Sequence, residues 1–171
     1  LHDLLSEEIS LTGCGRTDTG VHAEQYFAHF DSASDFKGRN LLYRLNTYLP
    51  KDIAVQGLFE VENAAHASFD ALLRTYEYRI SLIKDPFTTN TTLQIPYQKI
   101  NVSLMNEAAM ELLNHSNFKC FSRSGTEVKT FDCMISEACW TQKDELLVFS
   151  VTANRFLRNM VRAIVGTLLE I

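Results

Sequence analysis

The 171-residue sequence lacks the features that mark several large classes of protein. No apolar run approaches the roughly 20 residues that a membrane-spanning helix needs, so no membrane-embedded protein is expected. The first ten residues contain Asp3, Glu7 and Glu8 and no basic stretch, so no secretory signal peptide is visible. No low-complexity segment and no repeat of useful period occurs either. We expect a globular protein of the cytoplasm without a membrane partner.

Cysteine is scarce and is not arranged for metal binding. The four cysteines are Cys14, Cys120, Cys133 and Cys139. They form no C-x-x-C pair, and no second Cys/His pair stands at the spacing of a zinc site. The expected state of these residues is the free thiol of cytosolic proteins, and no metal site is predicted.

Length and composition fit one globular domain over residues 1–171. Hydrophobic residues make up 46% and charged residues 22%, which is enough apolar material for a buried core. The sequence begins at Leu1, without a methionine, and stops at Ile171 within an apolar helical pattern. From this we expect a domain that is truncated at both ends.

The net charge of −5 is unusual for a nucleic-acid-binding protein, which is commonly basic. The positive charges are nevertheless concentrated in two segments that contain no acidic residue, 37–51 and 152–169. The first holds Lys37, Arg39, Arg44 and Lys51, and the second holds Arg155, Arg158 and Arg162. Such local patches can bind phosphates while the rest of the surface stays acidic.

Hydrophobic periodicity predicts strands and helices in mixed order. The clearest strand is 74–83, because Tyr76, Tyr78 and Ile80 alternate with polar residues. Further strands are predicted at 9–12, 21–30, 53–61, 131–140 and 146–153, and helices at 1–8, 38–48, 102–114 and from about 154 onward. This order indicates an α+β fold with a mixed, mainly antiparallel sheet flanked by helices.

A loop with three glycines at 13–20, the first part of the segment 13–23, lies between two of the predicted strands. Glycines allow a sharp turn or a close approach to a ligand, so Asp18 in this loop can project its carboxylate into a cleft. Arg16, two residues away, can contact phosphates. An ordinary turn has the same composition, and spacing alone favours that interpretation. The loop is not a dinucleotide-binding motif, because the third glycine is missing and the acid lies inside the loop.

The last predicted helix carries arginines at positions i, i+3 and i+7, which would place Arg155, Arg158 and Arg162 on one face. Apolar residues fill the opposite face. One interpretation is a solvated basic stripe. The other is that one arginine turns inward against a buried carboxylate and favours the charged form that a catalytic aspartate needs.

Tyr76 and Tyr78 lie on the same side of their predicted strand. The simplest interpretation is a pair of core residues, but a tyrosine at a cleft can also stack on a base and offer its hydroxyl. The histidines show no ligand spacing, and we expect them to be structural hydrogen-bonding residues. The residues concerned are His22, His29, His66 and His115.

These segments, in this order, resemble the tRNA pseudouridine synthase A family over nearly the whole chain. The sequence G-R-T-D-T-G-V-H-A at 15–23 is similar to the family's signature loop, and 46–55 is similar to its N-x-x-L-P-x-D-I-A-V segment. The segments 66–69 and 74–78 resemble its H-A-R-F and R-x-Y-x-Y motifs. The segment 154–170 resembles its last catalytic motif. Motifs of this kind in this order are too specific a combination to arise by chance.

The resemblance implies a pseudouridine synthase fold, with ferredoxin-like halves around a central cleft, that works as a homodimer. It implies isomerisation of specific uridines to pseudouridine in the anticodon stem-loop of tRNA, without a metal or an organic cofactor. By position, Asp18 is the catalytic aspartate, and Arg162 pairs with it at an expected distance of roughly 4 Å. Tyr76 is the tyrosine that packs on the target base, and Arg16 helps to hold the surroundings of the flipped-out nucleotide.

Two positions depart from the family pattern. Ser68 replaces the arginine of H-A-R-F, which removes one phosphate contact, and Thr19 replaces the alanine that usually follows the aspartate. A competing interpretation is a non-catalytic tRNA-binding module, which would need the basic segments but not Asp18, Tyr76 and Arg162 together. The sequence also allows a nucleoside hydrolase that uses a carboxylate, or a purely structural domain.

Overall fold

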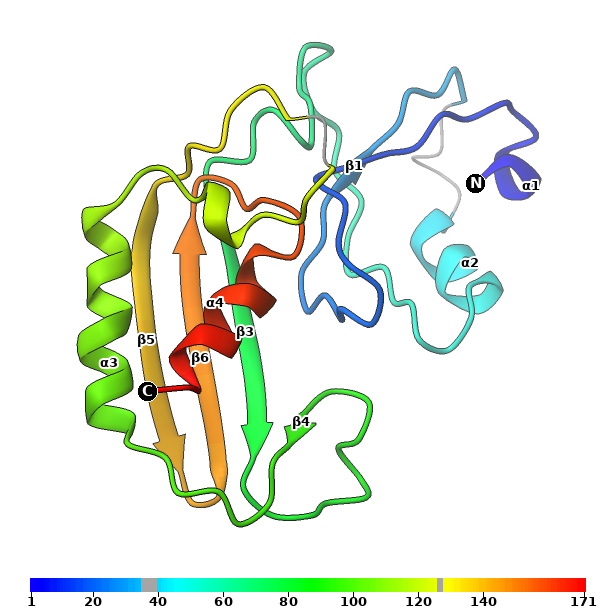
Figure 1. The fold of residues 1–171 in the computed structure, drawn as a ribbon. Coiled ribbons are helices and arrows are strands. Elements are labelled where there is room, and N and C mark those ends of the chain that lie inside the picture. The colour runs from blue at the N-terminus through cyan, green and yellow to red at the C-terminus, as the bar shows by residue number, and fades with distance from the viewer. Residues whose placement is uncertain (35–39, 126–127) are drawn as a thin grey trace. The chain divides into compact units, whose positions relative to one another are not determined.

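A computed structural model of the protein describes residues 1–34, 40–125 and 128–171 (Figure 1). Lys37 and Arg39 of the first basic segment lie outside the described residues. The chain divides into two compact units. The first comprises Leu1–Arg16 and Glu24–Asp70, and the second comprises Thr17–Ala23 and Ala71–Ile171. The loop of Asp18 therefore belongs to the second unit.

The first unit consists of short elements around a small apolar core. Its elements are α1 (His2–Leu5), β1 (Thr12–Gly13), β2 (Ala28–His29) and α2 (Leu41–Tyr48). The two strands pair antiparallel, and the helices bury Leu5, Leu41 and Leu45 against each other. The side chain of Asn40 caps α2 by accepting a hydrogen bond from the amide of Tyr43 at 3.3 Å.

The segment 53–61, predicted as a strand, is irregular in the structure. The side chain of Asn46 donates to the carbonyl oxygen of Val55 at 2.8 Å and accepts from its amide at 2.7 Å. An asparagine side chain thus satisfies the backbone groups that a neighbouring strand would otherwise bind. The strand predicted at 21–30 is likewise wrong in extent, because only β2 forms there.

The second unit contains a four-stranded sheet with the strand order β4-β3-β6-β5. Its strands are β3 (Arg74–Ser81), β4 (Leu93–Gln94), β5 (Ile135–Lys143) and β6 (Leu146–Ala153). β6 pairs antiparallel with both β3 and β5, and β4 pairs parallel with the end of β3. The α+β class with a mixed, mainly antiparallel sheet is therefore confirmed.

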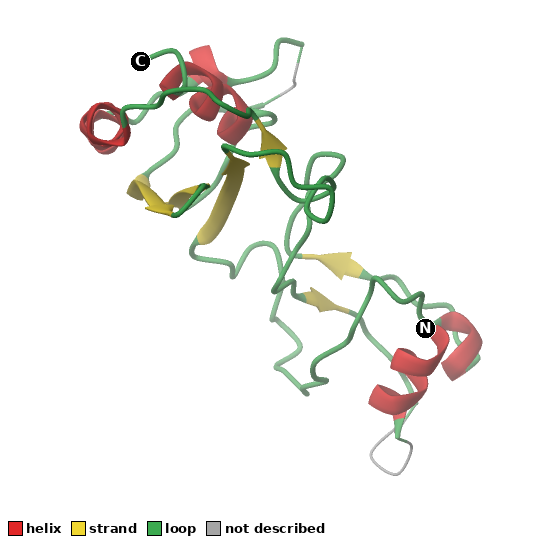
Figure 2. Ribbon diagram, turned by 90° about the horizontal axis from the view of Figure 1, so that it is seen from below, coloured by secondary structure: helices red, strands yellow, loops and turns green. Residues whose placement is uncertain are grey.

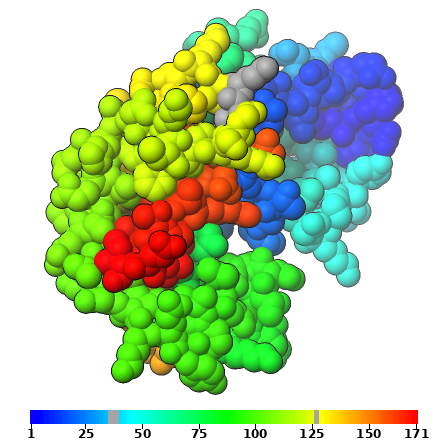
Figure 3. Space-filling view, in the orientation of Figure 1, coloured from blue at the N-terminus to red at the C-terminus, as the bar shows by residue number. Residues whose placement is uncertain are grey.

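One face of this sheet forms the main core, because strand side chains alternate between two faces. In β6 the residues of that face are all buried: Leu147, Phe149, Val151 and Ala153. Helices α3 (Val102–Glu111) and α4 (Met160–Leu168) cover this face and contribute Met105, Met160 and Ile164 to the same core. Figure 2 shows both helices on the same side of the sheet. The outer side of α4, orange to red in Figure 3, stays at the surface.

The local predictions for the second unit are confirmed where the apolar pattern is regular. The strand at 146–153 has the predicted limits, and the helix at 102–114 is α3 followed by the 3-10 turn η1 (Leu112–Asn114). A second 3-10 turn, η2, spans Lys119–Phe121. None of the helices in the described residues is long and apolar enough to cross a membrane.

Candidate active site

The loop 17–23 carries Asp18 at the start of a tight turn. The amide of Val21 donates to the carbonyl oxygen of Asp18 at 3.2 Å, and Gly20 between them has a φ of 83°. A type II turn requires a positive φ at this position, which glycine adopts without strain. The order of aspartate, threonine and glycine therefore determines the turn, and Asp18 is half-buried.

The side chain of Arg162 on α4 binds the backbone of this turn. The Nη2 atom of Arg162 donates a hydrogen bond to the carbonyl oxygen of Thr19 at 2.7 Å. The direct ion pair expected between Asp18 and Arg162 is not among the ion pairs that the described residues form. Arg162 is exposed. Because water competes strongly with an exposed ion pair, the guanidinium gains more from the adjacent peptide carbonyl.

Arg155 and Arg158 do not share a helical face with Arg162, so this prediction is wrong. Helix α4 begins only at Met160, and Asn159 before it has a φ of 66°. This left-handed conformation cannot continue a right-handed helix. The segment between β6 and α4 is therefore an irregular connection, and Arg162 is the one arginine of the three that lies on the helix.

Tyr76 lies on β3 at the margin of the main core. Its ring meets that of Phe156 edge-to-face, with 5.0 Å between the ring centroids and 85° between the planes. Both residues are half-buried, and Phe156 comes from the connection between β6 and α4. The position suits both interpretations of Tyr76, as a core residue and as a residue that contacts a base.

A network of hydrogen bonds fixes the strand ends beside Tyr76. Nη1 of Arg74 donates to the carbonyl oxygen of Asn154 at 2.8 Å. The Oδ1 atom of Asn154 accepts from the amide of Met134 at 2.8 Å, and the amide of Asn154 donates to the carbonyl oxygen of Met134 at 3.1 Å. These bonds tie the start of β3 to the end of β6 and to the chain before β5. Sequence reasoning missed this role of Arg74 and Asn154.

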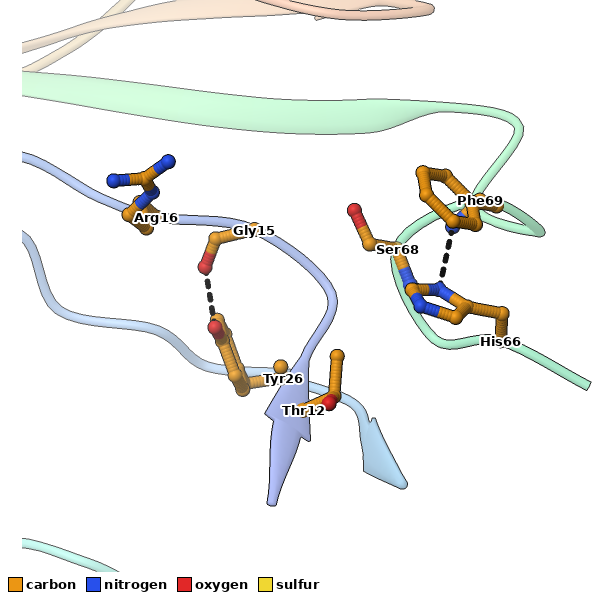
Figure 4. A pocket seen from close by; sticks show the side chains of 8 residues that line it. Thr12, Gly15, Arg16, Tyr26, His66, Ser68 and Phe69 are labelled. Carbon is orange, nitrogen blue, oxygen red and sulfur yellow. Dashed lines mark hydrogen bonds between the residues drawn. The ribbon is translucent and has the colours of Figure 1, made fainter. Parts of the chain in front are cut away.

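The first unit contains a pocket of about 310 Å³ (Figure 4). We call it the Phe69 pocket; it is lined by Thr12, Gly13, Gly15, Arg16, Tyr26, His66, Ser68 and Phe69. The hydroxyl of Tyr26 donates to the carbonyl oxygen of Gly15. The pocket thus joins the signature loop to the H-A-S-F segment. Arg16 belongs to this pocket, whereas Asp18, Tyr76 and Arg162 belong to the second unit.

Two histidines fix the backbone of the H-A-S-F segment. Nδ1 of His66 accepts from the amides of Ser68 and Phe69, each at 3.2 Å. Nδ1 of His29 accepts from the amide of Ala67 at 3.1 Å. Three successive amides therefore have imidazole acceptors, which holds the turn in one conformation. The prediction of a structural hydrogen-bonding role is confirmed for these two histidines.

Outside these two places, the described residues include titratable groups whose surroundings shift their pKa. The four cysteines are free thiols, as predicted, and burial raises the pKa of Cys133. Hydrogen bonds from Ser34 and its neighbours lower the pKa of Glu7. Over the residues that the structure describes, no three His, Cys, Asp or Glu side chains are grouped so that they could hold a metal ion.

Comparison with known proteins identifies the family. Residues 108–171 match the family described as tRNA pseudouridine synthase. The tRNA pseudouridine synthase A of Parabacteroides distasonis is 46% identical over 169 residues, which cover 98% of this chain and 67% of that protein. The tRNA pseudouridine synthase A of Bacteroides fragilis is 46% identical over 173 residues, which cover 100% and 68%. The chain belongs to the tRNA pseudouridine synthase A family.

Membership in the tRNA pseudouridine synthase A family confirms the predicted family and the predicted enzyme class. A more distant relative, the tRNA pseudouridine synthase A of Halalkalibacterium halodurans, is 41% identical over 166 residues, which cover 95% of this chain and 62% of that protein. The chain spans about two thirds of the length of these relatives. Both units of the structure lie within the matched region.

Tyr26 and Phe69 are the site candidates that sequence reasoning missed. They are more than 40 residues apart in sequence and line one pocket with Arg16. No local pattern signals such a pair, because each is an ordinary aromatic residue in its own segment. The available signal was the presence of Arg16 and Phe69 in two motifs of the tRNA pseudouridine synthase A family.

Proposed function

We propose that this protein converts uridine to pseudouridine in the anticodon stem-loop of tRNA, with Asp18 as the catalytic carboxylate. The observation that carries the proposal is the turn that begins at the half-buried residue Asp18, whose backbone Arg162 holds at Thr19. The relatives named tRNA pseudouridine synthase A support tRNA as the substrate. The choice of the anticodon stem-loop and of Asp18 is supported by the resemblance of the signature loop.

The reaction rearranges bonds within a single nucleotide. The bond between N1 of uracil and C1′ of the ribose breaks, the base turns, and C5 forms a new bond to C1′. The proton on C5 then leaves to solvent while N1 gains a proton, so the product is an isomer of the substrate. The target base must leave the stack to be reached, and the site must retain it while it is detached.

An ionised Asp18 can act in three ways. It can attack C1′, add to the base, or remove the proton from C2′. Each of these requires the carboxylate in contact with the flipped-out nucleotide. Arg162 would keep the turn in place beside it, Tyr76 would pack on the base, and Arg16 would bind the surroundings of the nucleotide.

We further propose that the protein works as a homodimer in the cytoplasm and needs neither a metal nor an organic cofactor. The support for these statements is the family resemblance. The chemistry agrees with the absence of a cofactor, because the isomerisation involves no net oxidation or reduction and exchanges one glycosidic bond for another with the movement of protons. The residues assigned above, Asp18, Tyr76, Arg16 and Arg162, are the groups that would act on the substrate.

Tritium release from tRNA labelled at C5 of uridine tests the proposal, because each isomerisation frees that hydrogen. We expect release by the protein, none by Asp18→Ala, and normal release by Asp31→Ala, which removes an exposed aspartate from the first unit. No release by a folded protein that binds tRNA would favour the non-catalytic tRNA-binding module. Free uracil among the products would indicate a hydrolase instead.

A further inference from the structure

We infer that the Phe69 pocket binds one unpaired nucleotide of the tRNA, with the base stacked on Phe69 and the phosphate at Arg16. The inference rests on the proposed function for the identity of the RNA. It adds Phe69 and His66, on the first unit, to the residues assigned above, and it gives Arg16, which also lies on the first unit, a phosphate to bind. The residues that carry it are Phe69, His66 and Arg16.

Phe69 presents an aromatic ring that is largely open to solvent. The residue is 82% exposed, although a ring of this size normally gains from burial. It stacks on the ring of His66, with 4.0 Å between the centroids and 23° between the planes. A ring supported from one side and open to solvent is the arrangement on which single-stranded nucleic acids stack their bases.

The backbone beneath this ring is already ordered. Beyond the imidazole acceptors described above, the amide of His66 donates to Oδ2 of Asp70 at 2.7 Å, and the amide of Asp70 donates to the carbonyl oxygen of His66 at 3.0 Å. A preorganised contact loses little conformational entropy when a ligand binds. The hydrogen bonding of the loop therefore favours a binding role for Phe69 over that of a surface residue placed by chance.

The opposite wall of the pocket offers polar and charged groups. In Figure 4 the guanidinium of Arg16 lies above Gly15, and the hydroxyl of Ser68 extends toward this wall. A guanidinium binds phosphate with two parallel hydrogen bonds, and a hydroxyl can bond a sugar or a base edge. An aromatic ring, a cation and hydroxyls around about 310 Å³ suit a nucleotide better than an apolar peptide.

The nucleotide must be unpaired, because a paired base has both faces covered by its neighbours in the helix. Proteins commonly recognise RNA through bases that are splayed out of loops and stacked on aromatic side chains. A stem-loop supplies such bases. The pocket would therefore hold an unpaired base from the loop of the substrate.

The test compares Phe69→Ala with Phe69→Trp and with Phe59→Ala. Phe59 is a matched control, because it lies in the same unit, is 79% exposed and does not line the pocket. Because Phe69→Ala removes the stacking of one base, we expect its Kd and KM for tRNA to be about tenfold higher and its kcat to be nearly unchanged. Phe69→Trp should restore binding because it keeps a stacking surface, and Phe59→Ala should bind normally.

A competition experiment checks that the base is unpaired. A ten-nucleotide oligouridylate should displace tRNA from the unchanged protein about tenfold more effectively than from Phe69→Ala. A fully paired RNA duplex should compete equally with both proteins. A stronger effect of Phe69→Ala on the duplex than on the oligouridylate would overturn the inference.

Two further outcomes would overturn it. One is an unchanged Kd for Phe69→Ala. The other is a change in sedimentation without a change in Kd, which would mean that Phe69 is covered by a second copy of the chain. Because Kd is measured without turnover, a protein that binds RNA through Phe69 but releases no tritium would refute the proposed function alone. A protein that releases tritium but binds independently of Phe69 would refute this inference alone.

Discussion

Arg162 and Thr19 are joined by a hydrogen bond of 2.7 Å from the guanidinium to the peptide carbonyl. The bond connects α4 to the turn of Asp18, 143 residues away in sequence. A neutral carbonyl occupies only part of the five donors of a guanidinium and leaves its charge uncompensated. Arg162 can therefore hold the turn and still bind a carboxylate or a phosphate when the substrate arrives.

Replacing Arg162 should slow catalysis more than it weakens the fold. We expect Arg162→Ala to lower kcat about 10- to 100-fold, because a misplaced turn carries Asp18 out of position. Arg162→Lys should recover part of this loss, since lysine keeps the charge and one donor. The thermal midpoint should change little, because the side chain is exposed.

Tritium release at saturating tRNA measures this kcat, and Arg158→Ala provides a comparison of equal charge. Arg158 is also exposed but lies before α4. Its loss should raise KM without the fall in kcat, because it removes a positive charge and no contact with the turn. If Arg162→Ala changed only KM as well, Arg162 would have no positioning role.

Gly20 and Gly125 allow the turn to be tested separately from general stability. Both have a positive φ, 83° and 73°, and among the described residues, chain neighbours aside, no heavy atom lies within 4 Å of an added Cβ at either. Alanine at either position should therefore lower the free energy of unfolding by about 1 kcal/mol through backbone strain alone. We expect a large fall in kcat for Gly20→Ala only. Denaturant unfolding and tritium release measure the two effects, and equal losses of activity would show that the turn has no special role.

Local elements of this fold can be predicted from the sequence, but contacts between residues that are far apart in sequence cannot. The strand at 146–153 was predictable because its alternation reports one buried face, and the turn at Gly20 because its composition is local. The start of α4 was not predictable, since the apolar pattern continues through Asn159 while its backbone is left-handed. The hydrogen bond of Arg162 to Thr19, in place of an ion pair with Asp18, was likewise not predictable, because it depends on how the elements pack in space.

Asn154→Ala should lower the free energy of unfolding by about 1–2 kcal/mol. The change removes the acceptor of the Met134 amide at 2.8 Å, at a point where three strands meet. Asn154→Asp keeps an oxygen at this position and should recover most of the loss. Asn114→Ala is the control: Asn114 is exposed and donates to Glu111 at 3.3 Å, so its loss should cost less than about 0.5 kcal/mol. Urea unfolding distinguishes these outcomes, and a loss as small as that of Asn114→Ala would contradict the structural role of Asn154.

Cys133 should make the protein less stable in alkali. The residue is 1% exposed, and burial raises the pKa of its thiol, while the charge of Arg155 partly opposes this rise. The unfolded chain releases the proton near its ordinary pKa of about 8.5, whereas the folded chain retains it. The free energy of unfolding is therefore at its full value below that pH. Above it, the free energy of unfolding falls by at most about 1.4 kcal/mol per pH unit.

Urea unfolding of the protein and of Cys133→Ala between pH 7 and pH 10 measures this effect. The variant should be less stable at pH 7 because it leaves a small cavity, and the difference should shrink as the pH rises, because alanine has no proton to lose. Iodoacetamide at pH 8 gives an independent readout: it should label the exposed Cys120 and spare Cys133 until the protein unfolds. Parallel stability curves would show that the thiol does not titrate differently in the two states, and rapid labelling of Cys133 in the folded protein would show that it is not buried.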